Sequence, residues 1–360
     1  MKNKSSTVWL VLDSRHFGGI ETHVLELAKG LLKLGIEAEV VFLADYGFHP
    51  LIQQLQRHGI KYRQLNNGFI SLFCARFAEK PLIVHGHGYK ANIAVKCLKY
   101  FSMQTTICTY HAGEALSGKL AAYDFIDRCS ASIADVVIAV SDEINKKVRG
   151  EAKVINNFVA VKPQSYPGKQ VAFVGRLSDE KGPQDFIRLA QHFSQQSFHI
   201  YGDGPLLESL AFSAPTNLIF HGYQIDMNDH WQDIGLLVMP SKFEGLPMAA
   251  LEAMSHGIPV CAYDVGRLNN LINHESGWLV PAGNFKQLKN CVSKWLSSSL
   301  TEHFHRTRCA RKAVIKGFSD DVVIPQVVSS YNQALINNNV GVSIVLNRET
   351  AKQRPSYGSV

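Results

Sequence analysis

The chain has 360 residues, of which 46% are hydrophobic and 19% are charged, and its formal net charge is +7. This length favours two domains, and the composition excludes wholesale disorder, a collagen helix and a coiled coil. No apolar run approaches the roughly 20 residues that a membrane-spanning helix needs, and we expect no signal peptide because the run Val8–Leu12 is too short for one.

The basic charge is concentrated in the first half of the chain. Up to Lys162 there are 20 Lys and Arg against 14 Asp and Glu, whereas the remainder has 17 against 16. Such an excess favours an anionic partner, such as a membrane surface or a phosphorylated ligand, but is too small to indicate nucleic acid. The seven cysteines are odd in number and form no C-x-x-C pair, which predicts free thiols in a reducing cytoplasm.

Short apolar segments alternate with amphipathic ones from the start of the chain. Strands are predicted at Val8–Leu12 and Ala38–Leu43, and the apolar spacing between them predicts a helix over Glu21–Leu34. Three further strands follow, each before a helical stretch: Pro81–His85, Thr105–Thr109 and Val136–Val140. This alternation is typical of a parallel sheet covered by helices on both faces.

A second series of the same kind follows Lys162–Gly168, a Pro- and Gly-containing segment that we interpret as an interdomain linker. Its predicted helices include Gln184–Phe193 and Met248–His256, and its predicted strands are Gln170–Gly175, Phe198–Gly202, Asn217–Gly222, Gly235–Met239 and Pro259–Ala262. The sequence therefore predicts two doubly wound α/β domains, 1–162 and 169–317, with a ligand site in the cleft between them. Residues 318–336 are predicted to form a helix that packs back on the N-terminal domain, and 337–360 a flexible tail.

The most informative motif lies between Pro240 and Met254. It places Glu244 and Glu252 eight positions apart around a Gly-Leu-Pro turn, with a helix that begins near Met248. Free backbone amides at that helix start form an anion site, and a carboxylate can accept hydrogen bonds from both hydroxyls of a vicinal diol. Surface glutamates at a helix entry would give the same pattern, so the interpretation depends on neighbouring motifs.

Glycine-containing turns accompany this motif. After the strand that ends at Gly175, Arg176 and Lys181 lie five positions apart on one loop and suit two phosphates. The turn Gly202-Asp203-Gly204 allows close approach of a base or ribose, although Leu207 stands where a dinucleotide fingerprint has its third glycine. Each turn alone is equally compatible with an ordinary surface loop.

Together these motifs resemble family 4 of the glycosyltransferases, the retaining family with the GT-B fold. The Glu244–Glu252 segment is similar to its Glu-(seven residues)-Glu motif, and Gly175–Gly182 is similar to its phosphate-binding loop. The segments His85–Lys90 and Thr109–His111 look like the histidine motifs of its N-terminal domain. The resemblance covers nearly the whole chain and implies the GT-B fold, in which two Rossmann-like domains face a central cleft.

The resemblance also implies a role for each matching residue. Arg176 and Lys181 would hold the donor pyrophosphate, Glu244 would contact the donor sugar, and His111 would lie beside the reacting sugar; these four form the implied catalytic set. His87 and Lys90 would be on the acceptor side. The implied donor-binding positions, among which Glu252 would contact the ribose and the amides after Gly245 the distal phosphate, are Gly18, Gly19, Gly202, Gly222, Gly245, Leu246, Met248 and Glu252.

The implied reaction moves a sugar from a nucleotide-diphosphate-sugar donor to a glycan or lipid-linked acceptor, with retention at the anomeric carbon. Cations and the helix start would stabilise the departing nucleoside diphosphate. We expect no metal, because the sequence has no Asp-x-Asp triplet, and no cofactor, because the nucleotide sugar is a substrate. One departure from the family is Val265–Asn270, where Arg267 and Asn270 replace residues of its donor loop.

Other interpretations account for fewer residues. Gly113–Leu120 nearly matches a P-loop, but Leu120 replaces the Ser or Thr that binds magnesium. The pairs His85/His87 and His303/His305 lack a third ligand at metal-binding spacing, so satisfied or solvent-facing histidines are expected. A hydrolase or epimerase on the same fold stays open, as does a catalytically silent nucleotide-sugar-binding partner of a glycan assembly complex.

The family's breadth and the absence of targeting signals lead us to expect a cytoplasmic enzyme of cell-surface polysaccharide biosynthesis (lipopolysaccharide, capsule or O-antigen). Lys90, Lys96 and Lys99, beside apolar residues of one predicted helix, leave two interpretations open. The helix either contacts an anionic membrane, on the inner face of the cytoplasmic membrane, or is an amphipathic helix packed on the sheet.

Overall fold

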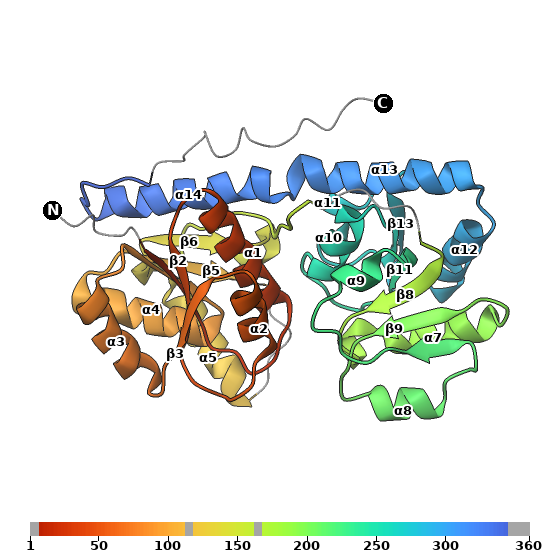
Figure 1. The fold of residues 1–360 in the computed structure, drawn as a ribbon, viewed down its shortest axis with the longest axis horizontal. Helices are drawn as coiled ribbons and strands as arrows, with labels where there is room; N and C mark the ends of the chain where they lie inside the picture. The colour runs from red at the N-terminus through yellow and green to blue at the C-terminus, as the bar shows by residue number, and fades with distance from the viewer. Residues whose placement is uncertain (1–6, 112–117, 162–167, 345–360) are drawn as a thin grey trace. The chain divides into compact units, whose positions relative to one another are not determined.

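The computed structural model describes residues 7–111, 118–161 and 168–344 (Figure 1). The chain divides into two compact units. Unit 1 comprises Met1–Asn156 and Asp320–Val360, and unit 2 comprises Asn157–Ser319. Most of the predicted linker and most of the predicted tail lie outside the described residues.

Unit 1 contains a parallel sheet with the strand order β3-β2-β1-β4-β5-β6-β7 in the described part of the chain. The order reverses between β1 and β4, which is the switch point where ligands bind in folds of this kind. The strands are β1 (Val8–Leu12), β2 (Ala38–Phe42), β3 (Lys61–Gln64), β4 (Ile83–His87), β5 (Thr106–Tyr110), β6 (Val136–Ala139) and β7 (Lys153–Val154). The helices are α1 (Gly19–Lys33), α2 (Pro50–Arg57), α3 (Gly68–Glu79), α4 (Tyr89–Ser102), α5 (Gly118–Cys129), η1 (Ala131–Ile133), α6 (Asp142–Asn145) and α14 (Asp320–Asn337).

Unit 2 repeats this plan with the strand order β10-β9-β8-β11-β12-β13, and its switch point lies between β8 and β11. Its strands are β8 (Gln170–Val174), β9 (Phe198–Tyr201), β10 (Leu218–Phe220), β11 (Ile234–Met239), β12 (Val260–Tyr263) and β13 (Gly277–Val280). Its helices are η2 (Asp179–Lys181), α7 (Pro183–His192), α8 (Leu207–Phe212), α9 (Asn228–Trp231), α10 (Met248–Ser255), α11 (Leu268–Leu271), α12 (Phe285–Leu296) and α13 (Leu300–Gly317).

Helix α14 belongs to unit 1 although it lies near the C-terminal end of the chain (Figure 1). Its side chains Val323, Val327 and Tyr331 are buried. Lys33 of α1 donates to the Asp320 carboxylate at 2.8 Å. The helix that was predicted over 318–336 is thus observed as an integral part of the N-terminal unit.

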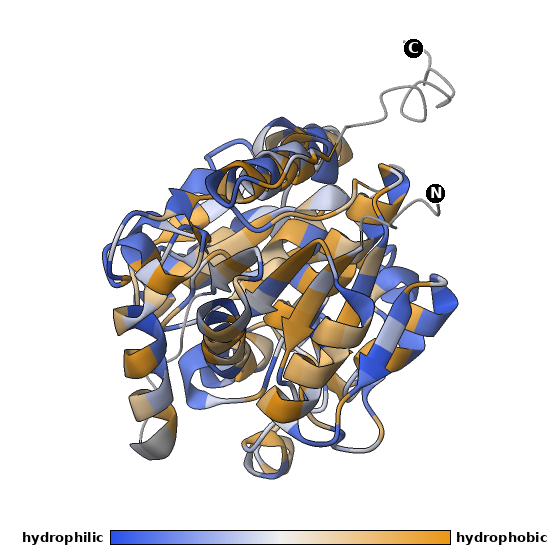
Figure 2. Cartoon of the chain, turned by 90° about the vertical axis from the view of Figure 1, so that its left-hand side faces the viewer, coloured by the Kyte–Doolittle hydropathy of each residue, from blue (hydrophilic) through white to orange (hydrophobic). Residues whose placement is uncertain are grey.

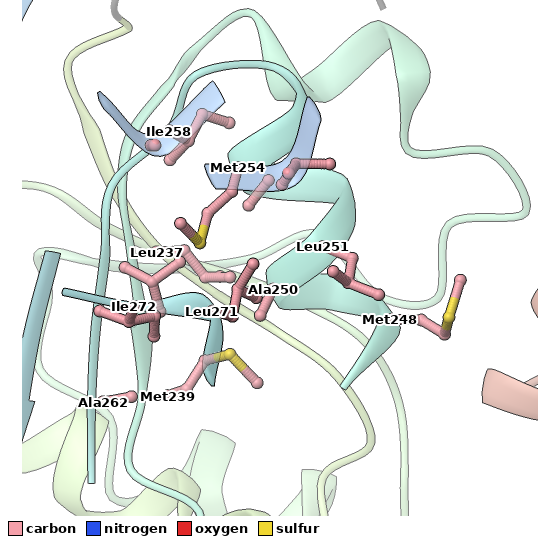
Figure 3. Packing of buried hydrophobic residues seen from close by; sticks show 14 of the residues in the cluster. Leu237, Met239, Met248, Ala250, Leu251, Met254, Ile258, Ala262, Leu271 and Ile272 are labelled. Atoms are coloured by element: carbon pink, nitrogen blue, oxygen red, sulfur yellow. The ribbon is translucent and has the colours of Figure 1, made fainter. Parts of the chain in front are cut away.

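The central strands of each sheet are buried because helices cover both faces of the sheet. All five side chains of β1 are buried, and so are all five of β2. Figure 2, in which unit 1 faces the viewer, shows hydrophobic residues along its central strands. In unit 2, Met254 of α10 points toward Leu237 of β11 within the core (Figure 3). Each such buried side chain contributes roughly 1.5–3 kcal/mol relative to exposure.

Three strands, β3, β7 and β13, lie outside the strands that the sequence predicted. β3 reads Lys-Tyr-Arg-Gln and is at the edge of its sheet, where its side chains are half-buried or exposed. β7 has two residues and β13 contains Gly277. Edge strands escape a search for apolar runs because water replaces one neighbour and polar residues are tolerated.

Candidate functional site

The motif residues of unit 2 gather at the carboxyl ends of four neighbouring strands. Gly222 follows β10, Gly202 follows β9, Arg176 follows β8 and Glu244 follows β11. These strands are adjacent in the sheet order, and the switch point lies between the last two. The residues come from separate segments, and the topology brings them to one edge of the sheet.

Backbone packing at this edge requires glycine. A Cβ atom on Gly202 would lie 1.9 Å from the carbonyl oxygen of Gly175. The Gly202 amide also donates to the carbonyl oxygen of Gly222 at 2.8 Å. The three turns are therefore in close contact, which leaves their backbones accessible without intervening side chains.

Lys181 and Glu244 form an ion pair at the switch point. The Lys181 Nζ atom lies 2.9 Å from both Oε1 and Oε2 of Glu244. The Glu244 side chain is 5% exposed and that of Lys181 is 26% exposed. A carboxylate buried to this extent needs a partner, and the lysine supplies one that solvent still reaches. Arg176, on the same loop as Lys181, is exposed.

The loops that carry this pair are joined through their backbones. The Lys242 amide donates to the Glu180 carbonyl oxygen at 2.8 Å. Gly182 has a φ of +63° and lies so close to Pro240 that a Cβ would be 2.2 Å from the proline oxygen. The positions of Lys181 and Glu244 are therefore fixed by the fold rather than by their own attraction alone.

The segment Val265–Asn270, which departs from the family pattern, packs against the loop that carries Glu244. Gly266, with a φ of +61°, has no space for a Cβ, which would lie 2.2 Å from the Glu244 carbonyl oxygen. The Arg267 amide donates to the Gly245 oxygen at 3.0 Å. With the Asn270 amide in its satisfied orientation, its oxygen lies 2.9 Å from Nε and Nη2 of Arg267. The two departing side chains therefore bind one another.

Helix α10 begins at Met248, after Pro247, at the same edge of the sheet. Amides of the first turn have no partner inside a helix, and the dipole adds positive potential there. The side chains of Leu246 and Met248 are buried, which leaves their backbone groups as the parts that would face a ligand; Figure 3 shows Met248 at the start of α10. Glu252 is half-buried on α10.

Unit 1 brings histidines together beside its own switch point. Gly18 and Gly19 precede and begin α1 after β1, while His87 ends β4 and His111 follows β5. The Nδ1 atom of His87 lies 3.3 Å from Nε2 of His111. His23 of α1 completes a triangle, with its ring centroid 5.5 Å from that of His87 and 4.8 Å from that of His111.

His87, which sequence spacing left without a third possible ligand, thus lies in a group of three histidines. Ligand atoms of His23, His87 and His111 all lie within 4.8 Å of one another. Sequence spacing could not reveal the group, because α1, β4 and the position after β5 each contribute one member. His303 does fit the expectation of a satisfied ring, since its Nε2 lies 3.0 Å from the Trp295 carbonyl oxygen.

Burial controls the protonation of these rings. Desolvation lowers the pKa of both His87 and His111 well below the usual value, and neighbouring histidines act in the same direction. Burial also lowers the pKa of His85 to about 3. The nitrogens of His85 contact Tyr331 Oη at 2.9 Å and Thr109 Oγ1 at 2.7 Å. Tyr331 of α14 is a supporting residue that the sequence gave no reason to select.

The three lysines that suggested a basic membrane-binding helix are paired with acidic residues. Lys90 binds Asp13 at 2.6 Å, and Lys99 binds Asp135 at 2.6 Å. The Lys96 ion pair with Asp127 measures 2.5 Å, and both side chains are 2% exposed. Helix α4 thus packs on the sheet as an amphipathic helix, and its three lysines have acidic partners within the same unit.

Two further expectations from the sequence concern the P-loop-like segment and membrane-spanning helices. Most of the P-loop-like segment falls on residues 112–117, which are outside the described residues. Among the helices that the structure describes, none has both the length and the apolar character to cross a membrane.

Two family models match the chain over most of both units. The one described as Glycosyltransferase Family 4 matches residues 17–162, and the one described as Glycosyl transferases group 1 matches residues 168–298. The chain belongs to glycosyltransferase family 4. It is accordingly a glycosyltransferase, and its two parallel-sheet units are the two Rossmann-like domains of the GT-B fold.

Curated relatives and solved structures agree with this assignment. The chain is 22% identical over 295 residues to the Escherichia coli UDP-Gal:alpha-D-GlcNAc-diphosphoundecaprenol alpha-1,3-galactosyltransferase, covering 75% of this chain and 74% of that protein. It is 32% identical over 177 residues to the O-antigen biosynthesis glycosyltransferase WbnH of Escherichia coli, covering 46% of this chain and 51% of that protein. The crystal structure of Anabaena Alr3699/HepE in complex with UDP has a TM-score of 0.73 at 20% identity, covering 90% of this chain and 99% of that one. The lipopolysaccharide outer core galactosyltransferase WaaB has a TM-score of 0.64 at 20% identity, covering 92% and 99%.

Proposed function

We propose that this glycosyltransferase binds a nucleotide-diphosphate sugar through unit 2 and transfers the sugar, with retention, to a glycan or lipid-linked acceptor. The observation that carries the proposal is the Lys181–Glu244 pair, with Nζ 2.9 Å from both carboxylate oxygens, beside the start of α10. A cation, a buried carboxylate and open helix amides are the groups that a sugar diphosphate needs.

The diphosphate is the part of the donor that these groups recognise. Lys181 supplies a point charge that solvent already reaches, Arg176 supplies a planar fork, and the α10 amides supply further donors. When phosphate oxygens approach Lys181, the Glu244 carboxylate gives up part of its bond to Nζ. It can then accept hydrogen bonds from sugar hydroxyls.

The remainder of the donor would lie along the same strand ends. Glu252 would accept hydrogen bonds from the ribose hydroxyls, and the open backbones of Gly202 and Gly222 would lie near the base. We propose uridine as that base. The Anabaena neighbour is solved with UDP, with UDP and glucose, and with UDP-glucose, and the Escherichia coli galactosyltransferase is named for UDP-Gal.

Leaving-group stabilisation is the main chemical demand of the reaction. Negative charge grows on the departing diphosphate while the anomeric carbon takes on oxocarbenium character. Arg176, Lys181 and the α10 amides place positive potential at the diphosphate, so we propose catalysis that needs no metal. Exclusion of water from the reacting carbon would favour transfer over hydrolysis.

Unit 1 supplies the neutral and acceptor-side groups in this proposal. The neutral His111 imidazole can accept a hydrogen bond from a sugar hydroxyl without repelling an oxocarbenium-like carbon. His87 lies against it, with the two ring nitrogens 3.3 Å apart. Lys90 is paired with Asp13 but its side chain is 35% exposed, so it is the proposed contact for a polar group of the acceptor.

We propose cell-surface polysaccharide biosynthesis as the setting, since relatives are named for O-antigen biosynthesis and for the lipopolysaccharide outer core. A peripheral position on the inner face of the cytoplasmic membrane belongs to the same proposal. Because the α4 lysines are paired, the candidate contact is the exposed apolar end of that helix, at Tyr100, Phe101 and Met103. Sedimentation with anionic lipid vesicles, compared with a Tyr100→Ser/Phe101→Ser variant, tests it.

A nucleotide screen tests the donor assignment. Unfolding temperature is measured with UDP, GDP, ADP and their sugars, because a ligand that binds the folded state stabilises it by mass action. We expect a shift with UDP and UDP-sugars, and no shift with any of the three nucleotides would contradict the assignment. NMR of the product then gives the anomeric configuration, and incubation without acceptor separates transfer from hydrolysis.

A further inference from the structure

The three clustered histidines of unit 1 have the arrangement of a metal site. We propose that His23, His87 and His111, hereafter the histidine cluster, bind one divalent cation of borderline softness, with Zn²⁺ as the best match. This site goes beyond the proposed function, in which His111 serves the sugar and catalysis needs no metal.

The distances fit a single cation. Each Zn–N bond is about 2.0 Å long, so two nitrogens on one tetrahedral zinc lie about 3.3 Å apart. The His87 Nδ1 and His111 Nε2 atoms are 3.3 Å apart, and the three ligand atoms lie within 4.8 Å of one another. For His23 to bind the same cation, its distances to the other two ligand atoms, at most 4.8 Å here, must come to about 3.3 Å.

The rings have the right chemistry as ligands. Zinc binds the neutral imidazole, and the buried surroundings of His87 and His111 favour that form. In the arrangement observed, a proton must lie between His87 Nδ1 and His111 Nε2 if they share a hydrogen bond. A cation between the two nitrogens replaces that proton without moving either ring far.

The two histidines of β4, His85 and His87, differ in the partners of their ring nitrogens. His85 uses both nitrogens, one with Tyr331 and one with Thr109. His87 is 2% exposed, and its Nε2 has no hydrogen-bond partner in the described part of the chain. The Nδ1 atom of His87 faces a second imidazole, that of His111, rather than a hydroxyl, and it is this atom that is placed to bind a cation.

A cation bound by three histidines would keep a position for one further ligand. Three neutral histidines do not cancel the charge of a divalent cation, and a tetrahedral zinc keeps a fourth position for water or an anion. A metal bound there would occupy the His111 ring. If the proposed role of His111 is right, Zn²⁺ therefore inhibits sugar transfer, and a chelator restores it.

Direct metal binding tests the proposal. Tag-free protein is dialysed against chelator and titrated with Co²⁺, whose visible absorption reports tetrahedral coordination, and Zn²⁺ then displaces it. Unit 2 has a second group of possible ligands, Glu275, His305 and Cys309, so every protein tested carries His305→Ala and Cys309→Ser; this double variant is the background protein. We expect one equivalent of metal, with affinity reduced at least about 100-fold by His23→Gln or His87→Phe.

Either of two results would overturn the proposal: no 1:1 binding of Zn²⁺ or Co²⁺ by the background protein, or unchanged affinity in both histidine variants. Circular dichroism confirms that each variant is folded, and Zn²⁺ should raise the unfolding temperature of the background protein but not of the variants. Because the visible absorption of Co²⁺ reports metal binding directly, this experiment tests the metal site independently of sugar transfer. Failure of the proposed function would show as absence of transfer by metal-free protein.

Discussion

The two switch points of this molecule differ in charge: one has an ion pair and the other has neutral histidines. In unit 2 a charged pair, Lys181 and Glu244, lies at the strand ends and is partly open to solvent. In unit 1 the corresponding edge holds His23, His87 and His111, whose rings pack against one another and whose burial favours the neutral form in His87 and His111. The same fold therefore provides one edge suited to a diphosphate and another suited to neutral hydrogen bonding or to a metal.

The largest effect should come from breaking the charged pair of unit 2. Lys181→Ala and Glu244→Ala should each reduce sugar transfer at least about 100-fold, because each removes a charged contact with the bound donor worth roughly 3 kcal/mol. Lys286→Ala, which removes an exposed lysine from α12 of the same unit, should leave kcat/KM unchanged. Near-normal turnover in either site variant would refute the assignment.

The loop under Glu244 can be disturbed without touching a charge. Gly266→Ala forces a Cβ against the Glu244 carbonyl oxygen, 2.2 Å away, at a φ of +61°. We expect donor affinity to fall about 10-fold, with a loss of at least about 1 kcal/mol of stability. The matched control is Gly283→Ala, at a φ of +75° with no atom within 4 Å. Equal donor affinities in the two variants would show that the loop does not position Glu244.

A smaller effect is expected from the support of the unit 1 edge. Tyr331→Phe leaves the His85 Nδ1 atom, now 2.9 Å from the hydroxyl, buried without its partner. Urea unfolding should show a loss of about 1–2 kcal/mol. Tyr100→Phe, which removes the hydroxyl of a side chain that is 75% exposed, should change the free energy of unfolding by less than about 0.5 kcal/mol. Similar values for both variants would deny His85 and Tyr331 a supporting role.

The smallest expected effect is on the pH dependence of stability, through His199, which lies outside both sites. Burial lowers the pKa of His199, so the unfolded chain binds its proton at a higher pH than the folded protein does. Stability from this group is complete above the unfolded value of about 6.5 and is lost as pH falls below it, by up to about 1.4 kcal/mol per pH unit. His199→Gln should therefore flatten the decline in unfolding free energy between pH 7 and pH 5, whereas His274→Gln, at an exposed position, should not.

The sequence predicts unit 2 better than unit 1 for a physical reason. Arg176 and Lys181 share one loop, and Glu244 and Glu252 flank one helix start, so local spacing already carries their chemistry. Buried strands such as β1 were predicted equally well, because coverage by helices on both faces favours apolar residues in them.

The histidine cluster lacks such a local signature. His23, His87 and His111 belong to three segments, and only the parallel order β1-β4-β5 brings them together. The lysines of α4 failed as predictors for a related reason. Their partners, such as Asp127 for Lys96, are distant in the sequence, so a paired cation looks like an exposed one. Arg267 and Asn270 are close in the sequence, but their contact depends on the backbone conformation at Gly266, which packs against Glu244. The sequence alone therefore did not predict it.

The most direct test of the central claim is the affinity of unit 2 for UDP, measured by isothermal titration calorimetry on wild-type protein and on Lys181→Ala, with Lys286→Ala as the charge-matched control. The account predicts that wild type and Lys286→Ala bind with equal affinity and that Lys181→Ala binds at least about 10-fold more weakly, a difference of about 1.4 kcal/mol. Equal affinity of all three proteins for UDP would contradict it.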